Sequence, residues 1–403
     1  MIDFINSQKG WFCAMPFYHI YSNSNGKWAP CCLAEESDKQ IDTTTIKEWW
    51  NSDTINELRT EMVYGASTDC INKFCSVCKN QEAIEGHSFR TEHNDRFNRF
   101  NEDSRGLYNA INEFKDTSTI DLDYIDERFL ELKLRLFGNK CNLTCFMCFP
   151  RDSNKRVKEV STLDVELQRD FKYDLIKDVE VPLDDLINQI LEIASNVSYI
   201  KIIGGEPLML KEHSKLLDAL ISSGHSKYIT LKYQTNLSLQ HNLTKYVNDF
   251  RHIHVSISLD STKEYNDYLR YGSDWNVIDN NIRELKQHKI SISVSATVTF
   301  LSILRYNDLI KYTKDWNIYL DYFILNTPDF LSIQHLPNKI KDRLMVEFRY
   351  YDDIYNVLDQ PRDEDKFQKA LKYCIELDRK QNLFDLFPEL KEYYVDNSSR
   401  PIN

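Results

Sequence analysis

Six segments of the chain alternate apolar and polar residues, which is the pattern of a β-strand with one buried face. Within Leu130–Leu136 every second residue is leucine, and Glu131, Lys133 and Arg135 stand between. Strands that alternate with helices predict an α/β fold with a parallel sheet and right-handed crossovers. The six segments are Phe129–Phe137, Tyr199–Ile203, Tyr228–Tyr233, Ile253–Leu259, Ile290–Val298 and Ile318–Leu325, and helical stretches such as Lys211–Ser223 and Val277–Lys289 lie between them.

The polar face of these strands argues against a tightly packed barrel. Strands of a closed, filled barrel read as nearly continuous apolar runs. In Ile253–Leu259 and Ile290–Val298 the second face instead carries histidine, serine and threonine. The pattern therefore favours a wide, hydrated interior. The alternative is a mostly antiparallel sheet with one solvated face, which the long helical crossovers disfavour.

The segments before and after the six predicted strands show the patterns of a hairpin, of helices and of a polar linker. Phe17–Ile20 and Lys27–Cys31 enclose a polar turn that ends in Asn25-Gly26, and such a turn predicts a β-hairpin. The next apolar periodicity predicts one helix over Thr44–Tyr64. Residues 91–128 are polar and read as a linker with a helical turn or two around Leu107–Phe114, and residues 331–403 read as a helical tail.

The composition of the chain excludes some classes of binding partner and indicates that cysteines bind metal. There are 62 acidic and 50 basic residues, so the net charge is −12, and no basic block offsets it. Nucleic acid and anionic membranes are therefore not expected partners. We see neither an apolar run of membrane-spanning length nor a signal-peptide pattern, which predicts a reducing, cytoplasmic location. Ten cysteines in that setting indicate metal ligation rather than disulfides.

Three of these cysteines, Cys141, Cys145 and Cys148, fall within eight residues after the first predicted strand. This spacing can wrap three sulfurs around one metal centre, one thiolate fewer than an iron–sulfur cluster ordinarily has. An open coordination position can accept a small molecule, as in catalytic zinc sites. A zinc knuckle or three reduced buried thiols remain alternatives. A second motif, Gly204-Gly205-Glu206-Pro207, follows the next predicted strand and would by itself read as an ordinary turn.

Together the two motifs resemble the signature of the radical S-adenosylmethionine (radical SAM) superfamily. The resemblance implies a partial (β/α)6 barrel over residues 129–330, with the helical tail over its open edge. It also implies that Cys141, Cys145 and Cys148 hold a catalytic 4Fe–4S cluster. The amino and carboxylate groups of SAM would chelate the fourth iron, and reductive cleavage of SAM would give a 5′-deoxyadenosyl radical that removes a hydrogen atom from the substrate.

The resemblance further assigns residues to SAM itself. Met147 would border the adenine, and the Gly-Gly-Glu-Pro motif would accept the SAM ammonium group. Polar residues at the ends of the third and fourth strands are placed where such barrels carry their active sites. In related enzymes a serine of the fourth strand and a following arginine bind the SAM carboxylate, and Ser258 and Arg270 match them. The full set of expected SAM contacts is Met147, Gly204, Gly205, Glu206, Pro207, Thr235, Asn236, Ser256, Ser258, Asp260 and Arg270.

The N-terminal cysteines form a second group. Cys13, Cys31 and the Cys75-x2-Cys78 pair have the layout of the twitch module, a shortened SPASM domain that carries an auxiliary 4Fe–4S cluster. In twitch proteins the module follows the barrel, whereas here it occupies residues 1–90 and precedes it. A four-cysteine zinc site has the same ligand set. Cys32 or Cys70 could also replace one of the four.

The sequence thus predicts a radical SAM oxidoreductase or maturase with an N-terminal auxiliary cluster. Its substrate would be a small molecule or a peptide, and its electron donor a protein such as flavodoxin or ferredoxin. The predicted organisation is a twitch-like module over residues 1–90, a linker over 91–128, the barrel over 129–330 and a helical extension over 331–403. The alternative is a non-catalytic iron–sulfur or zinc protein for binding or electron transfer, which would not turn over SAM.

Overall fold

The computed structural model describes residues 11–23, 27–34, 44–65, 68–99, 103–135, 138–172, 183–209, 213–377 and 379–395. The chain divides into two compact units, each built from separate stretches of sequence. The first comprises Met1–Gly138, Asp178–Gln234 and Leu243–His254, and the second comprises Asn139–Lys177, Thr235–Asn242 and Val255–Asn403. We describe each unit by itself.

The first unit contains a mostly parallel sheet in the order β2-β1-β3-β5-β6. Strand β1 pairs with β2 in antiparallel fashion, whereas the β1–β3, β3–β5 and β5–β6 pairs are parallel. The N-terminal hairpin is therefore part of this sheet rather than separate from it. The turn predicted around Gly26 lies outside the described residues. The strands are β1 (His19–Ser22), β2 (Trp28–Ala29), β3 (Leu130–Leu134), β5 (Val197–Ile202) and β6 (Thr230–Thr235).

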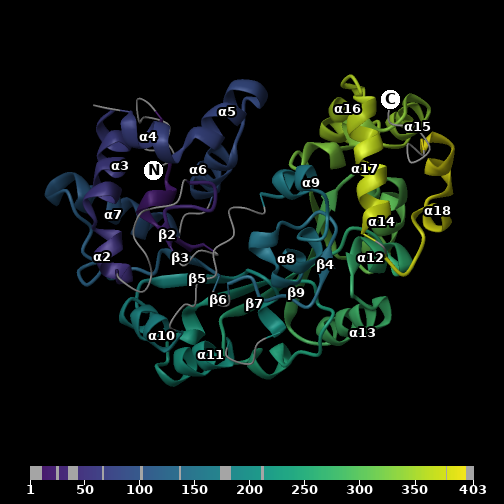
Figure 1. Cartoon of the computed structure of the whole chain (residues 1–403). Coiled ribbons are helices and arrows are strands. Elements are labelled where there is room, and N and C mark those ends of the chain that lie inside the picture. Colours follow the sequence, from purple (N-terminus) through teal and green to yellow (C-terminus); the bar gives the residue numbers. More distant parts are fainter. Residues whose placement is uncertain are drawn as a thin grey trace. The chain divides into compact units, whose positions relative to one another are not determined.

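Helices α10 (Leu183–Glu192) and α11 (His213–Ser222) lie on one side of β5 and β6 (Figure 1). The strands turn apolar side chains to one face, and the register aligns Leu132, Ile200 and Leu231 across three strands. All three are completely buried. Burial of such side chains contributes roughly 1.5–3 kcal/mol each, which explains why the alternating pattern specifies these strands.

The prediction of one helix over Thr44–Tyr64 is wrong in one respect. The segment forms two helices, α2 (Ile46–Trp50) and α3 (Asp53–Tyr64). Between them Ser52 has an extended backbone, with φ −65° and ψ 152°. The amide group of Asn51 exchanges two hydrogen bonds with the backbone of Ile120, at 2.9 and 3.0 Å. These contacts tie the break to a segment 69 residues away.

The predicted linker also contains more structure than expected. Helix α6 spans Phe89–Arg99, and α7 spans Asp103–Thr117, well beyond a turn or two. Helix α7 buries Ile111 and Phe114, and the Phe114 ring meets Phe17 edge to face with centroids 5.9 Å apart. The stretch is therefore packed structure. Helices α4 (Asp69–Phe74) and α5 (Ser76–Glu85) precede it.

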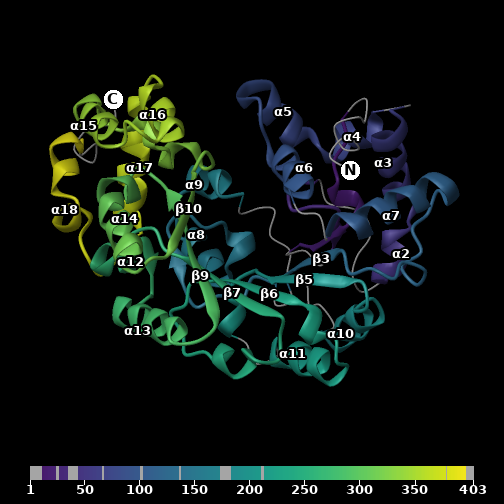
Figure 2. The ribbon, with the colours of Figure 1, turned by 180° about the vertical axis from the view of Figure 1, so that it is seen from behind.

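In the second unit β7 (His252–Ser258), which begins in the first unit, lies beside β9 (Ile290–Val298), and β10 (Tyr319–Ile324) pairs in parallel with β9 (Figure 2). Two short strands, β4 (Thr144–Cys145) and β8 (Arg270–Tyr271), form an antiparallel pair. The predicted α/β class with a mostly parallel sheet is confirmed.

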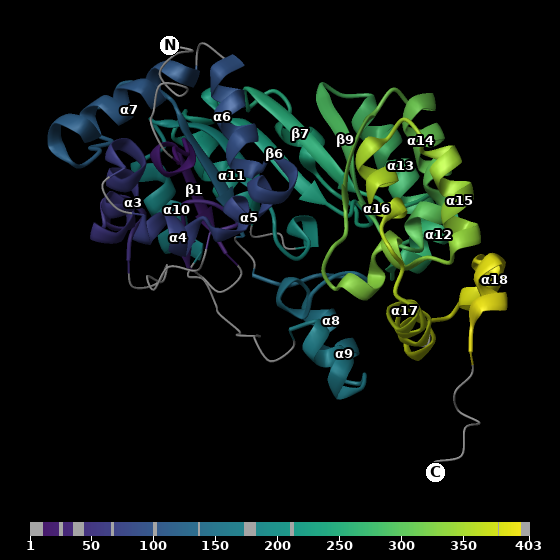
Figure 3. The same cartoon turned by 90° about the horizontal axis from the view of Figure 1, so that it is seen from above.

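Helices pack beside the strands of the second unit. Helices α12 (Lys263–Leu269), α13 (Trp275–Lys286) and α14 (Tyr306–Asp315) lie on the same side of β9 (Figure 3). The predicted tail contains helices, but its role as a cover of the barrel edge stays a prediction, as do the predicted domain boundaries. The remaining helices are α8 (Asn154–Val160), α9 (Val165–Asp170), α15 (Asn338–Glu347), α16 (Asp352–Asp359), α17 (Glu364–Glu376) and α18 (Leu383–Leu386).

Candidate active site

The cysteines of the Cys-x3-Cys-x2-Cys motif lie on one loop of the second unit. Cys145 belongs to β4 and stands opposite Arg270 of β8 in the antiparallel pair. Cys141 and Cys145 are buried, whereas Cys148 is partly exposed. The Cys148 N–H donates a hydrogen bond of 3.0 Å to the Cys145 carbonyl oxygen, which closes a tight turn. The structure therefore holds all three thiols on one short, ordered segment.

The three thiols also influence one another's ionisation. Burial raises the pKa of the Cys148 thiol well above its usual value, and Asp152, Cys145 and Cys141 raise it further. Burial likewise raises the pKa of Cys145, although Arg270 opposes this shift. Thiolates that are costly to form in this way become stable when a metal takes their charge. The donor set thus fits a metal centre bound through sulfur.

Arg270 and Asp260, both expected near SAM, form a buried ion pair beside the cysteine loop. Arg270 Nη2 donates to Asp260 Oδ1 at 2.9 Å, and Arg270 Nε lies 2.9 Å from Asp260 Oδ2. Arg270 Nη1 lies 3.8 Å from Cys145 Sγ. Asp260 is completely buried and also accepts a hydrogen bond of 2.8 Å from the Thr297 N–H. The guanidinium therefore carries positive charge to the candidate metal ligands.

The end of the third predicted strand reaches the same loop through Asn142, which sequence reasoning missed. The Asn236 side chain donates to Asn142 Oδ1 at 3.0 Å, and Asn142 Nδ2 donates to Ser238 Oγ at 2.8 Å. Thr235 Oγ1 accepts a hydrogen bond of 2.9 Å from the Leu237 N–H. These contacts bring Asn236 next to Asn142, the residue that follows Cys141. A lone asparagine in a loop gave no signal of this role.

Three other residues expected at the SAM site also belong to the second unit. Met147 is buried within the cysteine loop. Ser256 is buried on β7, and Ser258 is half-buried at the end of that strand, two residues before Asp260. Their contacts with SAM stay a prediction.

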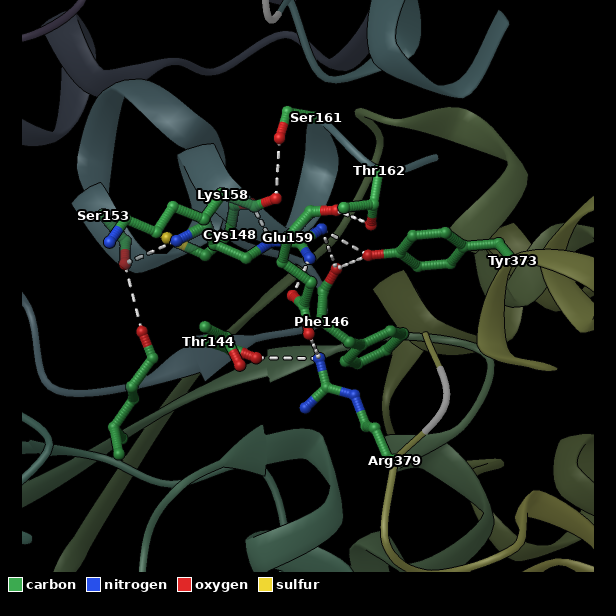
Figure 4. Close-up of polar contacts among 12 residues, drawn as sticks. Thr144, Phe146, Cys148, Ser153, Lys158, Glu159, Ser161, Thr162, Tyr373 and Arg379 are labelled. Atoms are coloured by element: carbon green, nitrogen blue, oxygen red, sulfur yellow. Dashed lines mark hydrogen bonds and ion pairs between the residues drawn. The ribbon is translucent and has the colours of Figure 1, made fainter. Parts of the chain in front are cut away.

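Arg156 and Tyr373 bond to the backbone of the cysteine loop, and neither was expected from the sequence. Figure 4 labels Tyr373 beside this loop. Arg156 Nε donates to the Cys148 carbonyl oxygen at 3.0 Å, and its Nη2 donates to that of Phe146 at 3.3 Å. The Tyr373 hydroxyl donates to the same Phe146 oxygen at 2.5 Å. Arg156 also bonds to the Tyr373 hydroxyl and to Glu159. The loop carbonyls are thus fixed by a buried cation and a buried phenol.

Arg379, from the C-terminal segment, also bonds to the backbone of the cysteine loop. Its Nη2 donates to the Thr144 carbonyl oxygen at 2.8 Å and lies 3.5 Å from Glu159, as Figure 4 shows. Its Nη1 donates to the Tyr268 carbonyl oxygen at 3.1 Å. Arg379 follows α17, so the predicted tail contributes side chains to the cysteine loop. No local pattern could have found contacts over more than 200 residues.

The Gly-Gly-Glu-Pro motif belongs to the first unit, directly after β5. Gly204 and Gly205 have φ values of +94° and +46°, a region that side chains disfavour. A Cβ atom at Gly204 would lie 2.9 Å from Arg135 Cγ and 3.1 Å from the Gly138 carbonyl oxygen. Glu206 is almost fully buried, and its Oε1 accepts a hydrogen bond of 3.0 Å from the Leu208 N–H. The turn therefore requires glycine for reasons of both conformation and space.

Four N-terminal cysteines line one small cavity in the first unit. They are the four that the sequence predicts, Cys13, Cys31, Cys75 and Cys78. Burial raises the pKa of Cys13 to about 12, with a further contribution from Cys75. Burial also raises the pKa of Cys75 to about 12, with contributions from Cys31 and Cys78. The four thiols are therefore neighbours, as a shared metal centre requires.

The two cysteines that the sequence left as alternatives have other surroundings. Cys32 packs against a small apolar cluster that includes Tyr21 and Ile203. Cys70 Sγ lies 3.7 Å from a carboxylate oxygen of Glu57. Neither lines the cavity of the other four.

Arg90, which sequence reasoning did not single out, also lines this cavity. Its Nε and Nη2 donate to the two carboxylate oxygens of Glu82 at 2.8 and 2.6 Å. Its Nη1 donates to the Phe12 carbonyl oxygen at 2.6 Å, and its guanidinium lies 4.5 Å from the centroid of the Trp11 ring. A fixed positive charge thus stands beside four potential thiolates. Within the described ranges, no three Cys, His, Asp or Glu side chains already form a site for a single metal ion.

Residues 136–311 match the family model of the Radical SAM superfamily. This segment of the chain is similar to the radical SAM superfamily. The match supports a SAM-dependent enzyme, as the sequence predicts. The match includes both motifs, covers 176 of 403 residues and ends before the C-terminal helices.

Several solved structures are similar to the chain at low sequence identity. anSMEcpe with bound AdoMet is 18% identical, and the alignment covers 60% of this chain and 66% of that chain with a TM-score of 0.40. Streptococcus suis SuiB bound to its precursor peptide SuiA is 17% identical, with coverages of 72% and 57% and a TM-score of 0.37. The chain thus spans just under two thirds of anSMEcpe. No curated protein matches the chain by sequence.

Among the residues that the structure describes, none of the helices is both long and apolar enough to cross a bilayer.

Proposed function

We propose that this protein is a radical SAM oxidoreductase or maturase with an auxiliary metal centre in its N-terminal segment. The observation that carries the proposal is the cysteine loop. Cys141, Cys145 and Cys148 lie together in a segment that matches the radical SAM superfamily. Beside them stands the Arg270–Asp260 pair, within 3.8 Å of Cys145 Sγ. A 4Fe–4S cluster ordinarily has four thiolate ligands, so three thiolates would leave one iron open.

In this proposal the three cysteines hold the catalytic cluster, and the side chains around them orient what is bound. When bound, the cluster supplies the electron that cleaves SAM into methionine and a 5′-deoxyadenosyl radical, which removes hydrogen from a small-molecule or peptide substrate. Arg270 offsets the negative charge of the thiolates. Asn236 fixes Asn142 beside Cys141.

The remaining SAM contacts are assigned by the same proposal. Gly204 and Gly205 leave the backbone accessible, and Glu206 receives the SAM ammonium group. Ser256, Ser258 and Thr235 supply polar groups at strand ends, and Met147 borders the adenine. Each assignment rests on the motif and on the position of the residue at the end of a strand.

The auxiliary centre in this proposal is a 4Fe–4S cluster held by Cys13, Cys31, Cys75 and Cys78. Its support is that the four line one cavity together with the cation of Arg90. Such a centre suits an oxidation, because it can accept an electron from a product radical. Zinc is the competing occupant, since four thiolates also satisfy its tetrahedral coordination. An electron donor such as flavodoxin or ferredoxin would complete the reaction.

An anaerobic reconstitution tests the proposal. We would load the full chain with iron and sulfide, add dithionite and SAM, and measure 5′-deoxyadenosine together with bound iron and zinc. The expected result is 5′-deoxyadenosine from a protein with roughly eight irons per chain. About four irons and one zinc would keep the radical chemistry but reject the auxiliary cluster. A fully loaded protein that forms no 5′-deoxyadenosine would establish the non-catalytic alternative.

Cysteine variants separate the two centres. Replacement of Cys141, Cys145 and Cys148 by alanine should abolish SAM cleavage. Replacement of Cys75 and Cys78 should leave cleavage but remove about four irons. Cys70→Ala is the matched control, because Cys70 lies outside the cavity, and its iron content should equal that of the parent. Cleavage of SAM by the triple variant would refute the assignment of the catalytic ligands.

A further inference from the structure

Three buried arginines lie around the cysteine loop of the second unit. Arg156 belongs to α8, Arg270 belongs to β8, and Arg379 follows α17. Their exposed fractions are 0%, 9% and 7%. Arg270 contacts the loop through Cys145 Sγ at 3.8 Å, and the other two contact it through backbone carbonyl oxygens. Because arginine stays protonated in proteins, three fixed positive charges lie beside three potential thiolates.

The carboxylates that pair with these arginines are fewer than the arginines. Asp260 pairs with Arg270, and both of its oxygens lie 2.9 Å from guanidinium nitrogens. Glu159 is shared, because one of its oxygens bonds to Arg156 and the other lies 3.5 Å from Arg379 Nη2. Among the described residues, three guanidinium groups thus pair with two carboxylates, and one positive charge is left in excess.

Arg379 is the least well compensated of the three cations. The carboxylate oxygen of Glu159 lies 3.5 Å from it, whereas that of Asp260 lies 2.9 Å from Arg270. In the part of the chain that the structure describes, Arg379 Nε has no hydrogen-bond partner. A buried charge is costly unless a counter-ion lies close and in good geometry. The environment of Arg379 therefore suits a further negative charge nearby.

The cysteine loop is the neighbour that can carry this charge. Arg379 Nη2 donates a hydrogen bond of 2.8 Å to the carbonyl oxygen of Thr144, the residue before Cys145 (Figure 4). Its Nη1 donates a bond of 3.1 Å to that of Tyr268, two residues before Arg270. Arg379 thus links β4 to the segment that leads into β8. Burial raises the pKa of the Cys145 thiol, and Arg270 and Arg379 both oppose this rise.

We propose that Arg379 is a positioning residue of the catalytic centre, which holds the cysteine loop at Thr144 and favours the reduced state of a cluster bound there. The inference rests on the proposed function, and it gives a role in electron uptake to a residue beyond the segment that matches the superfamily. Reduction adds one electron to the cluster, and the electron comes from the external donor. A fixed cation nearby therefore stabilises the reduced cluster more than the oxidised one.

Redox titration of charge variants tests this role. The parent would be the full chain with Cys75→Ala and Cys78→Ala, loaded anaerobically with iron and sulfide, so that the electron paramagnetic resonance signal comes from the catalytic cluster. Arg379→Gln should lower the ratio of reduced to oxidised cluster roughly tenfold at a fixed potential, which is about 59 mV for one electron. Arg379→Lys keeps the charge but not the forked hydrogen bonds. Its potential should therefore stay close to that of the parent even where its melting temperature falls.

A second variant should shift the potential in the opposite direction. Glu159→Gln removes the negative charge that Arg156 and Arg379 share, so it should raise the ratio of reduced to oxidised cluster. Opposite shifts from two neighbouring changes would not arise from a general loosening of the loop. The matched control is Arg349→Gln, at an exposed arginine of the same unit, which should titrate like the parent.

Three results would overturn the inference. They are a parent-like potential in Arg379→Gln, an equal fall in Arg379→Lys, and a potential that does not rise in Glu159→Gln. The last result decides the matter where Arg379→Gln does not keep its cluster. The potentials are measured without SAM and are thus separate from its cleavage. A parent whose cluster titrates but forms no 5′-deoxyadenosine would reject the proposed activity and still decide the role of Arg379, whereas a parent that assembles no cluster would reject both.

Discussion

Tyr373 donates a hydrogen bond of 2.5 Å to the carbonyl oxygen of Phe146, although 227 positions separate the two residues. Phe146 lies between the second and third cysteines of the Cys-x3-Cys-x2-Cys motif. Tyr373 is completely buried and belongs to α17, beyond the part of the chain that matches the superfamily. The C-terminal helix is therefore part of the support of the candidate metal loop.

Removal of that hydroxyl should loosen the loop. In Tyr373→Phe the ring still fills its space, but the Phe146 oxygen loses one of its two partners among the described residues and keeps Arg156. The variant also loses the hydrogen bond that Arg156 donates to the hydroxyl, so two buried hydrogen bonds are lost, at about 0.5–1.5 kcal/mol each. We expect a lower melting temperature, and faster loss of iron from the loaded protein on exposure to a chelator, because the Cys145–Cys148 turn is less constrained.

Tyr319→Phe is the control for this prediction, since Tyr319 is 72% exposed and lies on the edge strand β10. Its melting temperature and rate of iron loss should match those of wild type. Equal rates of iron loss from Tyr373→Phe and wild type would show that Tyr373 stabilises the fold but does not constrain the cysteine loop.

The buried pair of Asp260 and Arg270 should be more sensitive to a single change than to a double one. Asp260→Asn leaves a buried guanidinium without its counter-ion, which typically costs about 3–5 kcal/mol. Asp260→Asn combined with Arg270→Gln removes both charges and should cost less than Asp260→Asn alone. Denaturant unfolding of the two single variants and the double variant measures the coupling. Additive losses would show that the pair does not act as a unit.

Much of the fold could be predicted from local patterns, because a strand shows itself by apolar and polar residues that alternate along consecutive positions. The strands β3, β5, β6, β7, β9 and β10 all overlap predicted segments, and β5, β6 and β7 extend one or two residues beyond them. What could not be predicted depends on partners far along the chain. The break at Asn51 depends on Ile120, and the parallel pairing of β1 with β3 places residue 19 opposite residue 131.

The same distinction holds at the candidate site. Cysteine spacing identified the loop, but Tyr373 and Arg379 reach it from more than 200 residues away and leave no local signature. Spacing also left Cys32 and Cys70 as alternatives, since it does not say where a side chain points. Helix α6 was missed because its residues are mainly polar and give no apolar stripe.

Arg90 should set the potential of the auxiliary centre rather than its assembly. A nearby positive charge favours the reduced, more negative cluster. Arg90→Gln should therefore lower the midpoint potential of the auxiliary signal, on the order of 50 mV. Arg90→Lys keeps the charge and should stay close to wild type. Redox titration followed by electron paramagnetic resonance measures both, and a module that shows no redox signal because it holds zinc would contradict this prediction.

Gly204 should not tolerate even one added carbon. In Gly204→Ala the new Cβ would lie 2.9 Å from Arg135 Cγ and 3.1 Å from the Gly138 carbonyl oxygen, at a φ of +94°. Gly224→Ala is a matched control, because Gly224 has a φ of +76° but open space around its Cβ position. Both variants should lose about 1–2 kcal/mol through backbone strain. Only Gly204→Ala should also weaken SAM binding, by about tenfold or more, because the turn must shift where the SAM ammonium group is proposed to bind. Equilibrium binding of SAM to the loaded proteins separates the two effects, and equal affinity in both variants would remove the turn from the SAM site.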